Sequence, residues 1–155
     1  MSQNALPKVS IVTPSFNQAP FLEQTLRSVL EQDYPNLEYI VIDGGSSDGS
    51  LEIIHKYADR LAYWQSQPDQ GQTDAINQGF ARASGEILAW LNSDDLLLPG
   101  AVSAAVRALH EHPEASMVYG DALLINAEGK TIGKFPAAQT DYRKLRRGYV
   151  HIPQQ

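Results

Sequence analysis

Two adjacent carboxylates, Asp94 and Asp95, are the residues of this sequence best suited to carry chemistry. They follow an apolar run, residues 87–91 (ILAWL), from which only Asn92 and Ser93 separate them. Neighbouring acids at the end of a buried strand repel one another unless a cation, hydrogen-bond donors or water compensate their charge. Carboxylate oxygens are ligands that Mg²⁺ and Mn²⁺ prefer, together with the phosphate oxygens of a substrate. The pair therefore predicts a divalent-metal site.

The alternative role for these two acids is capping of the following helix. Proline is favoured at the first helical position, so Pro99 predicts a helix that begins there, with Leu98 in the cap position. Asp94 and Asp95 lie several residues before Leu98, which weakens the capping interpretation.

A third carboxylate, Asp43, ends another apolar run, residues 37–42 (LEYIVI), and precedes the loop GGSSDG at residues 44–49. An aspartate before Gly-Gly often folds a turn through its own side-chain hydrogen bonds. A buried carboxylate in a nucleotide cleft can instead accept a hydrogen bond from the imide of uracil or from N1 and N2 of guanine. The residues by themselves leave both interpretations open. Asp48 is expected to cap the next helix.

Other nucleotide-binding and metal-binding motifs fit poorly. Residues 44–49 lack the spaced glycines of a dinucleotide-binding fingerprint. Gly129-Lys130-Thr131 resembles the end of a P-loop, but Leu124 stands where that motif needs its first glycine. His110 and His112 lack the one-turn spacing of a zinc-binding helix, and the absence of cysteine excludes thiolate ligands. Any metal here would have oxygen or imidazole ligands.

Composition sets limits on the class of protein. A chain of 155 residues, 43% hydrophobic and 19% charged, predicts one globular domain over residues 1–155. The net charge of -6 argues against broad nucleic-acid binding, so no nucleic-acid partner is expected. Neither a secretory signal nor an apolar run of about 20 residues is found, which predicts a cytoplasmic protein. One basic cluster is either a solvated surface or a contact for an anionic lipid or acceptor; it comprises Arg143, Lys144, Arg146 and Arg147.

Apolar runs alternate with helical patterns along the chain. Strands are predicted at residues 9–13, 37–42, 61–66, 87–91 and 117–119, helices at 20–32, 51–57, 73–80 and 99–110, and a hairpin at 123–134. This alternation predicts an α/β fold with a mostly parallel sheet covered on both faces. Ligands of such sheets bind outside the carboxyl ends of the strands. We therefore expect Pro14-Ser15, Asp43 and residues 92–95 to converge on one cleft.

Proline and small residues add two local expectations to this fold. Pro14 is expected to end the first strand, which a turn would stop at this point. Ala75 and Gly79 lie one turn apart in the helix that starts near Thr73, so that helix can pack close against the sheet.

Four blocks of the sequence resemble family 2 glycosyltransferases of the GT-A fold. They are residues 10–32 (SIVTPSFNQAPFLEQTLRSVLEQ), 39–50 (YIVIDGGSSDGS), 68–87 (PDQGQTDAINQGFARASGEI) and 88–100 (LAWLNSDDLLLPG). The resemblance covers essentially residues 9–155. It implies a GT-A sheet flanked by helices, a UDP- or GDP-linked nucleotide-diphospho-sugar donor, and Mn²⁺ or Mg²⁺ as cofactor.

The resemblance also implies roles for residues at the strand ends. The end of the first strand, Thr13, Pro14 and Ser15, would border the nucleotide, and Asp43 would contact the base. Gln70, Gly71 and Asp74 resemble a loop and helix start that close over the nucleotide. For Asp74 the alternative is an internal hydrogen bond that orients this loop.

The family's D-x-D motif falls on Asn92-Ser93-Asp94. Asparagine replaces the first acid; it can still hydrogen-bond the ribose or phosphate, but it adds no negative charge. Asn92 and Ser93 would thus contact the nucleotide, Asp94 would be the main metal ligand, and Asp95 would be its neighbour.

The resemblance implies transfer with inversion at the anomeric carbon, assisted by a carboxylate general base. That base is expected beyond Gln155, in an acceptor-side region that this chain largely lacks, so the chain by itself is expected to be inactive. Asp121 is the candidate base within it. The acceptor would be a saccharide or a lipid-linked sugar, with peripheral association at the inner face of a membrane.

Two alternatives belong to other functional classes. A nucleotide-sugar-binding domain without turnover would bind donor but transfer nothing. A receiver-like signalling domain needs acids after the first strand, where residues 14–17 (PSFN) stand instead.

Overall fold

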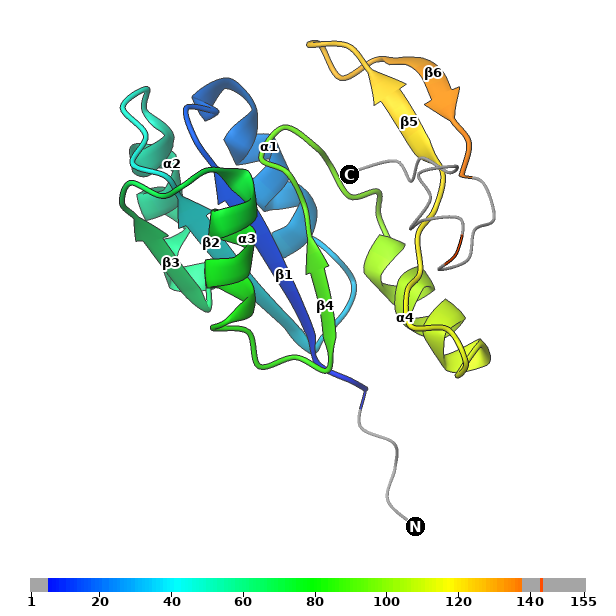
Figure 1. Ribbon diagram of the computed structural model, residues 1–155. Coiled ribbons are helices and arrows are strands. Elements are labelled where there is room, and N and C mark those ends of the chain that lie inside the picture. Colours follow the sequence, from blue (N-terminus) through cyan, green and yellow to red (C-terminus); the bar gives the residue numbers. More distant parts are fainter. Residues whose placement is uncertain (1–5, 138–142, 144–155) are drawn as a thin grey trace. The chain divides into compact units, whose positions relative to one another are not determined.

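The computed structural model describes residues 6–137 and residue 143. The chain divides into two compact units between Val106 and Arg107, within helix α4 (Ala101–Glu111). The first unit holds the parallel sheet and the second holds a β-hairpin (Figure 1). No helix within the described ranges has the length and apolar character needed to cross a bilayer.

The sheet of the first unit has four parallel strands, β1 (Val9–Ser15), β2 (Leu37–Asp43), β3 (Tyr63–Ser66) and β4 (Ile87–Trp90). Their order is β3-β2-β1-β4, with β1 and β2 in the centre. The central strands are runs of β-branched and apolar residues, as strands buried on both faces should be. The predicted parallel α/β sheet is confirmed.

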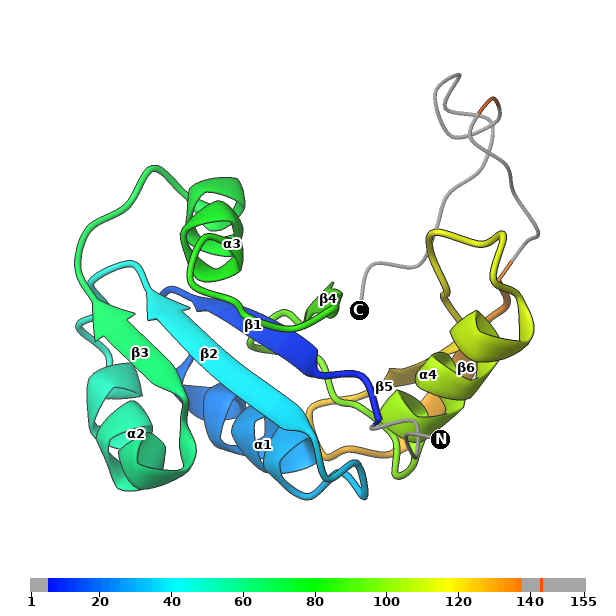
Figure 2. The same cartoon turned by 90° about the horizontal axis from the view of Figure 1, so that it is seen from below.

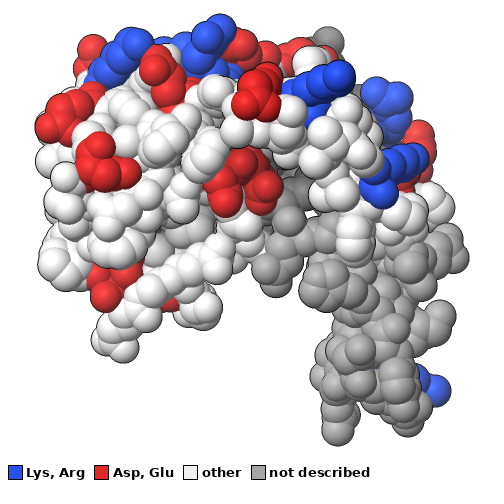
Figure 3. Space-filling view, turned by 90° about the horizontal axis from the view of Figure 1, so that it is seen from above, with Lys and Arg blue, Asp and Glu red and all other residues white. Residues whose placement is uncertain are grey.

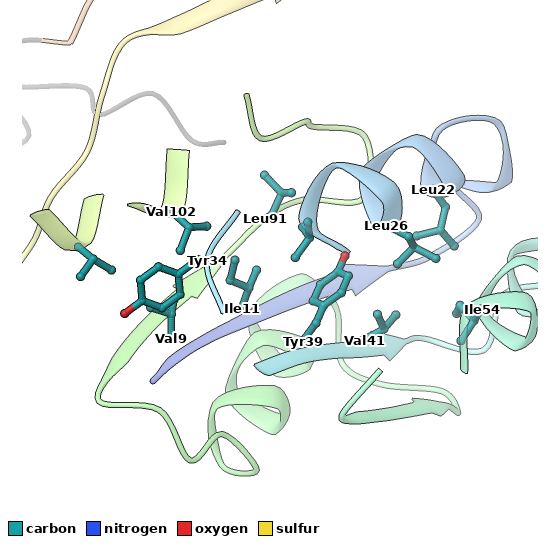
Figure 4. Close-up of a cluster of buried hydrophobic side chains, with 12 residues drawn as sticks. Val9, Ile11, Leu22, Leu26, Tyr34, Tyr39, Val41, Ile54, Leu91 and Val102 are labelled. Atoms are coloured by element: carbon teal, nitrogen blue, oxygen red, sulfur yellow. The ribbon is translucent and has the colours of Figure 1, made fainter. Parts of the chain in front are cut away.

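Helices cover both faces of this sheet (Figure 2). α1 (Ala19–Leu30) and α2 (Ser50–Tyr57) lie on one face, and α3 (Gln72–Phe80) lies on the other. A 3-10 turn, η1 (Ala58–Arg60), joins α2 to β3. Leu22 and Leu26, one turn apart on α1, pack in one buried cluster with Ile11 of β1 and Tyr39 of β2 (Figure 4).

α3 packs close against β1, as its small residues predict. Ala75 and Gly79 are buried, and a Cβ on Gly79 would come within 2.4 Å of a methyl group of Val12. Ile40 and Ile42 of β2 complete this second cluster with Val12 and Ala75. This packing holds the first turn of α3 near the carboxyl ends of β1 and β2.

Pro14 does not end β1, which continues to Ser15. The carbonyl of Val12 accepts a hydrogen bond from the Leu91 amide on the β4 side, so Pro14, two residues further on, faces the same side. The pairing of β1 with β4 ends at Val12 and Trp90. A proline here removes no ladder hydrogen bond, which is why the strand tolerates it.

The prediction that a helix begins at Pro99 is wrong by two residues. Pro99 and Gly100 are the middle of a turn in which the Ala101 amide donates to the Leu98 carbonyl at 3.1 Å. Gly100 has φ 78°, and Pro followed by a left-handed Gly is typical of a type II turn. α4 then begins at Ala101.

β4 is apolar, but it is covered less well than expected. Leu88 and Trp90 are exposed, although they pair in register with Ser10 and Val12 of the buried strand β1. Alternation along β4 buries only part of it, because it is an edge strand of the four-stranded sheet.

The second unit contains an antiparallel hairpin, β5 (Ala122–Ile125) and β6 (Thr131–Phe135). The Asn126 side chain accepts hydrogen bonds from the amides of Glu128 and Lys130, and Gly129 takes φ 76°, so the chain turns here and the predicted hairpin is confirmed. Residues 117–119 do not form the predicted fifth strand.

Candidate functional site

The polar strand ends lie on one edge of the sheet, as predicted. Ser15 and Asp43 are register partners in β1 and β2, and the Gly44 amide donates to the Ser15 carbonyl at 2.8 Å. Residues 92–95 follow β4, the other neighbour of β1. Figure 3 looks onto the side on which these strands end and shows acidic side chains exposed there.

The two adjacent acids lie in a tight turn after β4, which we call the acid turn (residues 92–95). The Asp95 amide donates to the Asn92 carbonyl at 3.1 Å and closes it. The Asp94 side chain is exposed and has no hydrogen bond or ion pair with any described residue. Burial and the nearby charge of Asp94 raise the pKa of Asp95, and a hydrogen bond from Asn92 opposes this shift only in part. The pair thus carries negative charge that the described residues leave poorly compensated.

Asn92 links the acid turn to the start of α3. Its side-chain amide donates to Asp95 Oδ2 at 3.1 Å, and its Oδ1 accepts a hydrogen bond from Gln72 Nε2 at 2.7 Å. An aspartate at this position could not donate to Asp95 and would add a third negative charge. The departure from D-x-D therefore replaces a charged group with one that positions Asp95. Ser93 is buried, so its side chain faces away from solvent.

Asp94 and Asp95 fit a divalent cation that takes most of its ligands from elsewhere. Within the described residues, no group of three or more His, Cys, Asp or Glu could hold a metal ion. Two carboxylates leave several positions of an octahedral shell for phosphate oxygens and water, which is how Mg²⁺ is commonly bound beside nucleotides. The donor set thus fits a metal shared with a phosphorylated ligand.

Asp43 organises the loop that follows β2. Its side chain is 0% exposed. Its oxygens accept hydrogen bonds from the amides of Gly45 and Ser46 at 3.1 and 2.9 Å, and from the hydroxyls of Ser46 and Ser66 at 2.5 and 2.6 Å. The turn-folding role is therefore realised in this structure. Contact between Asp43 and a base stays a prediction, and it requires the buried carboxylate to become accessible.

The last three residues of β1 differ in whether their side chains are available to a ligand. Thr13 is fully buried, and its hydroxyl pairs with the Tyr39 hydroxyl at 2.8 Å, so its side chain belongs to the core and does not reach the strand end. Pro14 is buried as well. Ser15 is 4% exposed, and its hydroxyl oxygen is the one buried side-chain nitrogen or oxygen atom of the described residues without a hydrogen-bond partner. Ser15 is thus the member of this trio with unused hydrogen-bonding capacity.

Two residues of this edge have a place that the sequence reasoning missed. Phe16 is 60% exposed beside Ser15, although phenylalanine is usually buried. Asp69 packs against the backbone of Gly44, where an added Cβ would lie 3.0 Å from Asp69 Oδ2. Phe16 could have been found from the sequence, because it directly follows a predicted strand end. Asp69 could not, because its contact with Gly44 joins two loops that are distant in sequence.

The loop before α3 is held by carboxylates of its own. Asp74 Oδ2 accepts hydrogen bonds from the Gln70 amide at 3.0 Å and from Gln78 Nε2 at 2.9 Å. Asp69 Oδ1 accepts one from the amide of Gly71, which has φ 103°. For Asp74 the structure therefore shows the loop-orienting alternative. Gln70 and Gly71 themselves are exposed.

Asp121, the candidate base of the second unit, is an unfavourable proton acceptor. Its carboxylate pairs with Lys134 at 2.5 Å and accepts a hydrogen bond from the Ala137 amide at 2.8 Å. These two contacts, the lysine first, lower the pKa of Asp121. A general base works best with a pKa near the operating pH, so the ion pair argues against this role. Of the basic cluster, Lys144, Arg146 and Arg147 lie outside the described residues, and Arg143 is exposed.

Comparison with known proteins identifies relatives over most of the chain. The family model Glycosyl transferase family 2 matches residues 10–152. An uncharacterized glycosyltransferase of Mycobacterium tuberculosis is 44% identical over 116 residues, which are 74% of this chain and 44% of that protein. The GalNAc(5)-diNAcBac-PP-undecaprenol beta-1,3-glucosyltransferase of Campylobacter jejuni is 36% identical over 134 residues, covering 84% of this chain and 42% of the relative. The chain thus spans less than half the length of these relatives.

Solved structures of glycosyltransferases share the fold. The mannosyltransferase PcManGT from Pyrobaculum calidifontis, solved with GDP-Man and Mn²⁺, superposes with a TM-score of 0.64 at 28% identity, covering 79% of this chain and 37% of that one. S. aureus TarS 1-349 with UDP-GlcNAc superposes with a TM-score of 0.62 at 27% identity, over 68% and 32% of the two chains. The four-stranded parallel sheet with its helices is therefore a glycosyltransferase fold of the GT-A type.

Proposed function

This chain belongs to glycosyl transferase family 2, and from that premise we propose that the sheet edge bearing the acid turn binds a nucleotide-diphospho-sugar together with Mn²⁺ or Mg²⁺. The observation that carries the proposal is the state of Asp94 and Asp95. They are adjacent, they lie where parallel strands end, and one of them has no partner among the described residues. A cation bridging these acids to a diphosphate would compensate both sets of charges.

We assign the nucleoside to the neighbouring ends of β1 and β2. The exposed ring of Phe16 offers a stacking surface for a base, and stacking suits every base because each has a π-face. The unpaired hydroxyl of Ser15 is a donor or acceptor for the ligand. The loop after Asp43 would border the base, and Asp43 would either fix this loop or contact the base itself.

The loop at Gln70 and Gly71, held by Asp74, would lie over the bound nucleotide. Its connection to the acid turn runs through Gln72 and Asn92, whose side chains are hydrogen-bonded at 2.7 Å. This contact places the start of α3 next to the turn that would hold the cation. Asn92 would also be within reach of the ribose or phosphate.

The proposed reaction is transfer of the sugar, with inversion, to a hydroxyl of a saccharide or lipid-linked acceptor. A divalent cation at the acid turn would offset the negative charge that develops on the leaving nucleoside diphosphate. The C. jejuni relative is named for a polyprenol-linked acceptor, which supports that acceptor class. A nucleotide-sugar-binding protein without turnover is the alternative, and acceptor-dependent release of nucleoside diphosphate separates the two.

Metal-dependent nucleotide binding tests the site directly. We expect UDP or GDP to bind in the presence of Mn²⁺ and to lose at least about tenfold in affinity after chelation. Ligand at ~100 times its dissociation constant should stabilise the fold by about 2.7 kcal/mol, which a thermal-shift assay detects. Calorimetry then gives the affinity with and without metal.

Asp94→Asn should abolish this dependence on metal. Asp59→Asn is the matched control, because Asp59 is an exposed aspartate of η1, before β3 rather than after a strand end, and its substitution makes the same change in charge. Equal binding by wild-type protein with and without metal would rule out the cation site. Equal loss in both variants would point to net charge instead.

A further inference from the structure

The acid turn is held from behind by polar side chains of one stretch of sequence. Thr25 and Ser28 lie three residues apart in α1, and Gln32 follows two residues after the helix ends. Residues with this spacing share one side of a helix. All three bond to backbone atoms of residues 93–102. The path of that segment is therefore set by side chains about 70 residues earlier in the chain.

Thr25 makes the central contact. Its hydroxyl lies 2.9 Å from the carbonyl oxygen of Ser93 and 2.9 Å from that of Asp95, so its single hydrogen is shared between these two acceptors. These are the two carbonyls on either side of Asp94. Thr25 is completely buried, whereas Asp94 is exposed. The backbone around Asp94 is thus tied to the interior while its carboxylate faces solvent.

Gln32 holds the other end of the segment. Its Nε2 donates to the Leu98 carbonyl at 3.0 Å, and its Oε1 accepts from the Val102 amide at 3.2 Å. The Ser28 hydroxyl, between these two anchors, accepts from the Leu97 amide at 3.1 Å. Since every contact is made to backbone, the side chains of the segment are left out of this tethering.

We infer that Thr25 and Gln32 are positioning residues for cation binding, acting through the backbone of the acid turn and touching neither cation nor nucleotide. The inference rests on the proposed function, since it assigns the acids to a cation. A threonine inside a helix commonly bonds to its own helix four residues back. Here the Thr25 hydroxyl bonds to backbone carbonyls of the acid turn instead. Valine would fill the same buried volume, so packing does not require the hydroxyl.

The test compares two substitutions of Thr25. Thr25→Val keeps the shape and removes the hydroxyl, whereas Thr25→Ser keeps the hydroxyl and removes the methyl group. Residues that orient metal ligands typically change metal affinity by about 10- to 100-fold. We expect Thr25→Val to weaken Mn²⁺ affinity, and Mn²⁺-dependent UDP or GDP affinity, at least about tenfold, with Thr25→Ser within about threefold of wild type. Metal-free nucleotide affinity should be the same for all three proteins.

Mn²⁺ alone is titrated by electron paramagnetic resonance, and the nucleotides by calorimetry, on variants whose circular dichroism matches wild type. Equal Mn²⁺ affinity of Thr25→Val and wild type, including no affinity in either, would overturn the inference. Equal weakening by Thr25→Val and Thr25→Ser would also overturn it, because loss of packing would then be the cause. Wild-type protein that binds Mn²⁺ but no nucleoside diphosphate would instead overturn the proposed function.

If Thr25→Val does not fold, Gln32→Met provides the second test, because Gln32 lies past the helix end and is only partly buried. This change removes the tethers to Leu98 and Val102 and keeps a similar volume. We expect Mn²⁺ affinity to fall about threefold or more. Unchanged Mn²⁺ affinity in folded Gln32→Met would overturn the inference.

Discussion

Carboxylates at the two ends of the same sheet stand in opposite electrostatic conditions. At the amino end, Glu38 of β2 is 11% exposed and accepts hydrogen bonds from Ser10, Ser84 and Lys8. Burial alone would raise the pKa of Glu38, but these donors outweigh burial and lower the pKa to about 2. At the carboxyl end, burial and Asp94 raise the pKa of Asp95.

The difference separates a structural carboxylate from one available to a ligand. Glu38 joins the start of β1, β2 and the segment before β4, and its charge is satisfied by the protein itself. Asp94 and Asp95 have one described side-chain donor between them, the amide of Asn92. Perturbed acids in such a setting are candidates for function because the protein leaves their charge uncompensated. The two ends should therefore respond oppositely to mutation.

Removing Glu38 should produce the largest effect. Glu38→Ala would leave the Ser84 amide and the Ser10 hydroxyl without this acceptor and Lys8 without its carboxylate partner, and hydrogen bonds to a charged group contribute about 1.5–3 kcal/mol each. We expect the free energy of unfolding to fall by about 4 kcal/mol in urea titrations, with no specific effect on metal affinity. Glu52→Ala, at an exposed position of α2, is the control and should change stability by less than about 1 kcal/mol. Similar losses in both variants would contradict the structural role of Glu38.

Acid should weaken the fold through the same group. A carboxylate whose folded pKa is lowered stabilises the folded state above its unfolded pKa, and this contribution is lost as pH falls through the folded value. For Glu38, whose pKa falls from 4.5 to about 2, the window is roughly pH 5 to pH 2 and the contribution is about 3 kcal/mol. Urea unfolding at pH 7 and pH 3 should show part of this loss in wild type. In Glu38→Gln that component should be missing; an unchanged pH dependence would refute the assignment.

Much of the fold follows from local pattern. Local signals, each within ten or so residues, are the apolar runs of β1 and β2 and the apolar stripe of α1. The turn from Asn126 to Gly129 is also local, because the Asn126 side chain bonds to amides of the turn itself. The error at Pro14 occurs where a neighbouring strand decides the outcome, whereas the error at Pro99 is local, because Pro99 and Gly100 form a turn before the helix. Pro14 is tolerated because the pairing of β1 with β4 has already ended beside it.

The site divides in the same way. Asp94, Asp95 and Asp43 could be found from their position after apolar runs. The internal bonding of Asp43, the burial of Thr13 and the bridge from Gln72 to Asn92 depend on contacts between distant segments. Thr25 looks like any polar residue within a helix until its hydroxyl is seen on the acid turn. A single sequence holds no periodic signal for such pairs.

The smallest effect on the free energy of unfolding is expected at Asp94, the residue that the proposed function assigns to the cation. Asp94→Asn removes one of two adjacent negative charges and no described hydrogen bond, so the fold loses nothing and is relieved of a repulsion with Asp95. For exposed charges such terms amount to about 0.5 kcal/mol or less. We expect the free energy of unfolding of Asp94→Asn, measured in urea without metal at low salt, to equal or slightly exceed that of wild type. Salt should reduce the difference, because it screens exposed charges. A loss above about 1 kcal/mol would make Asp94 a structural residue like Glu38, and the contrast between the two ends of the sheet would then no longer identify the site.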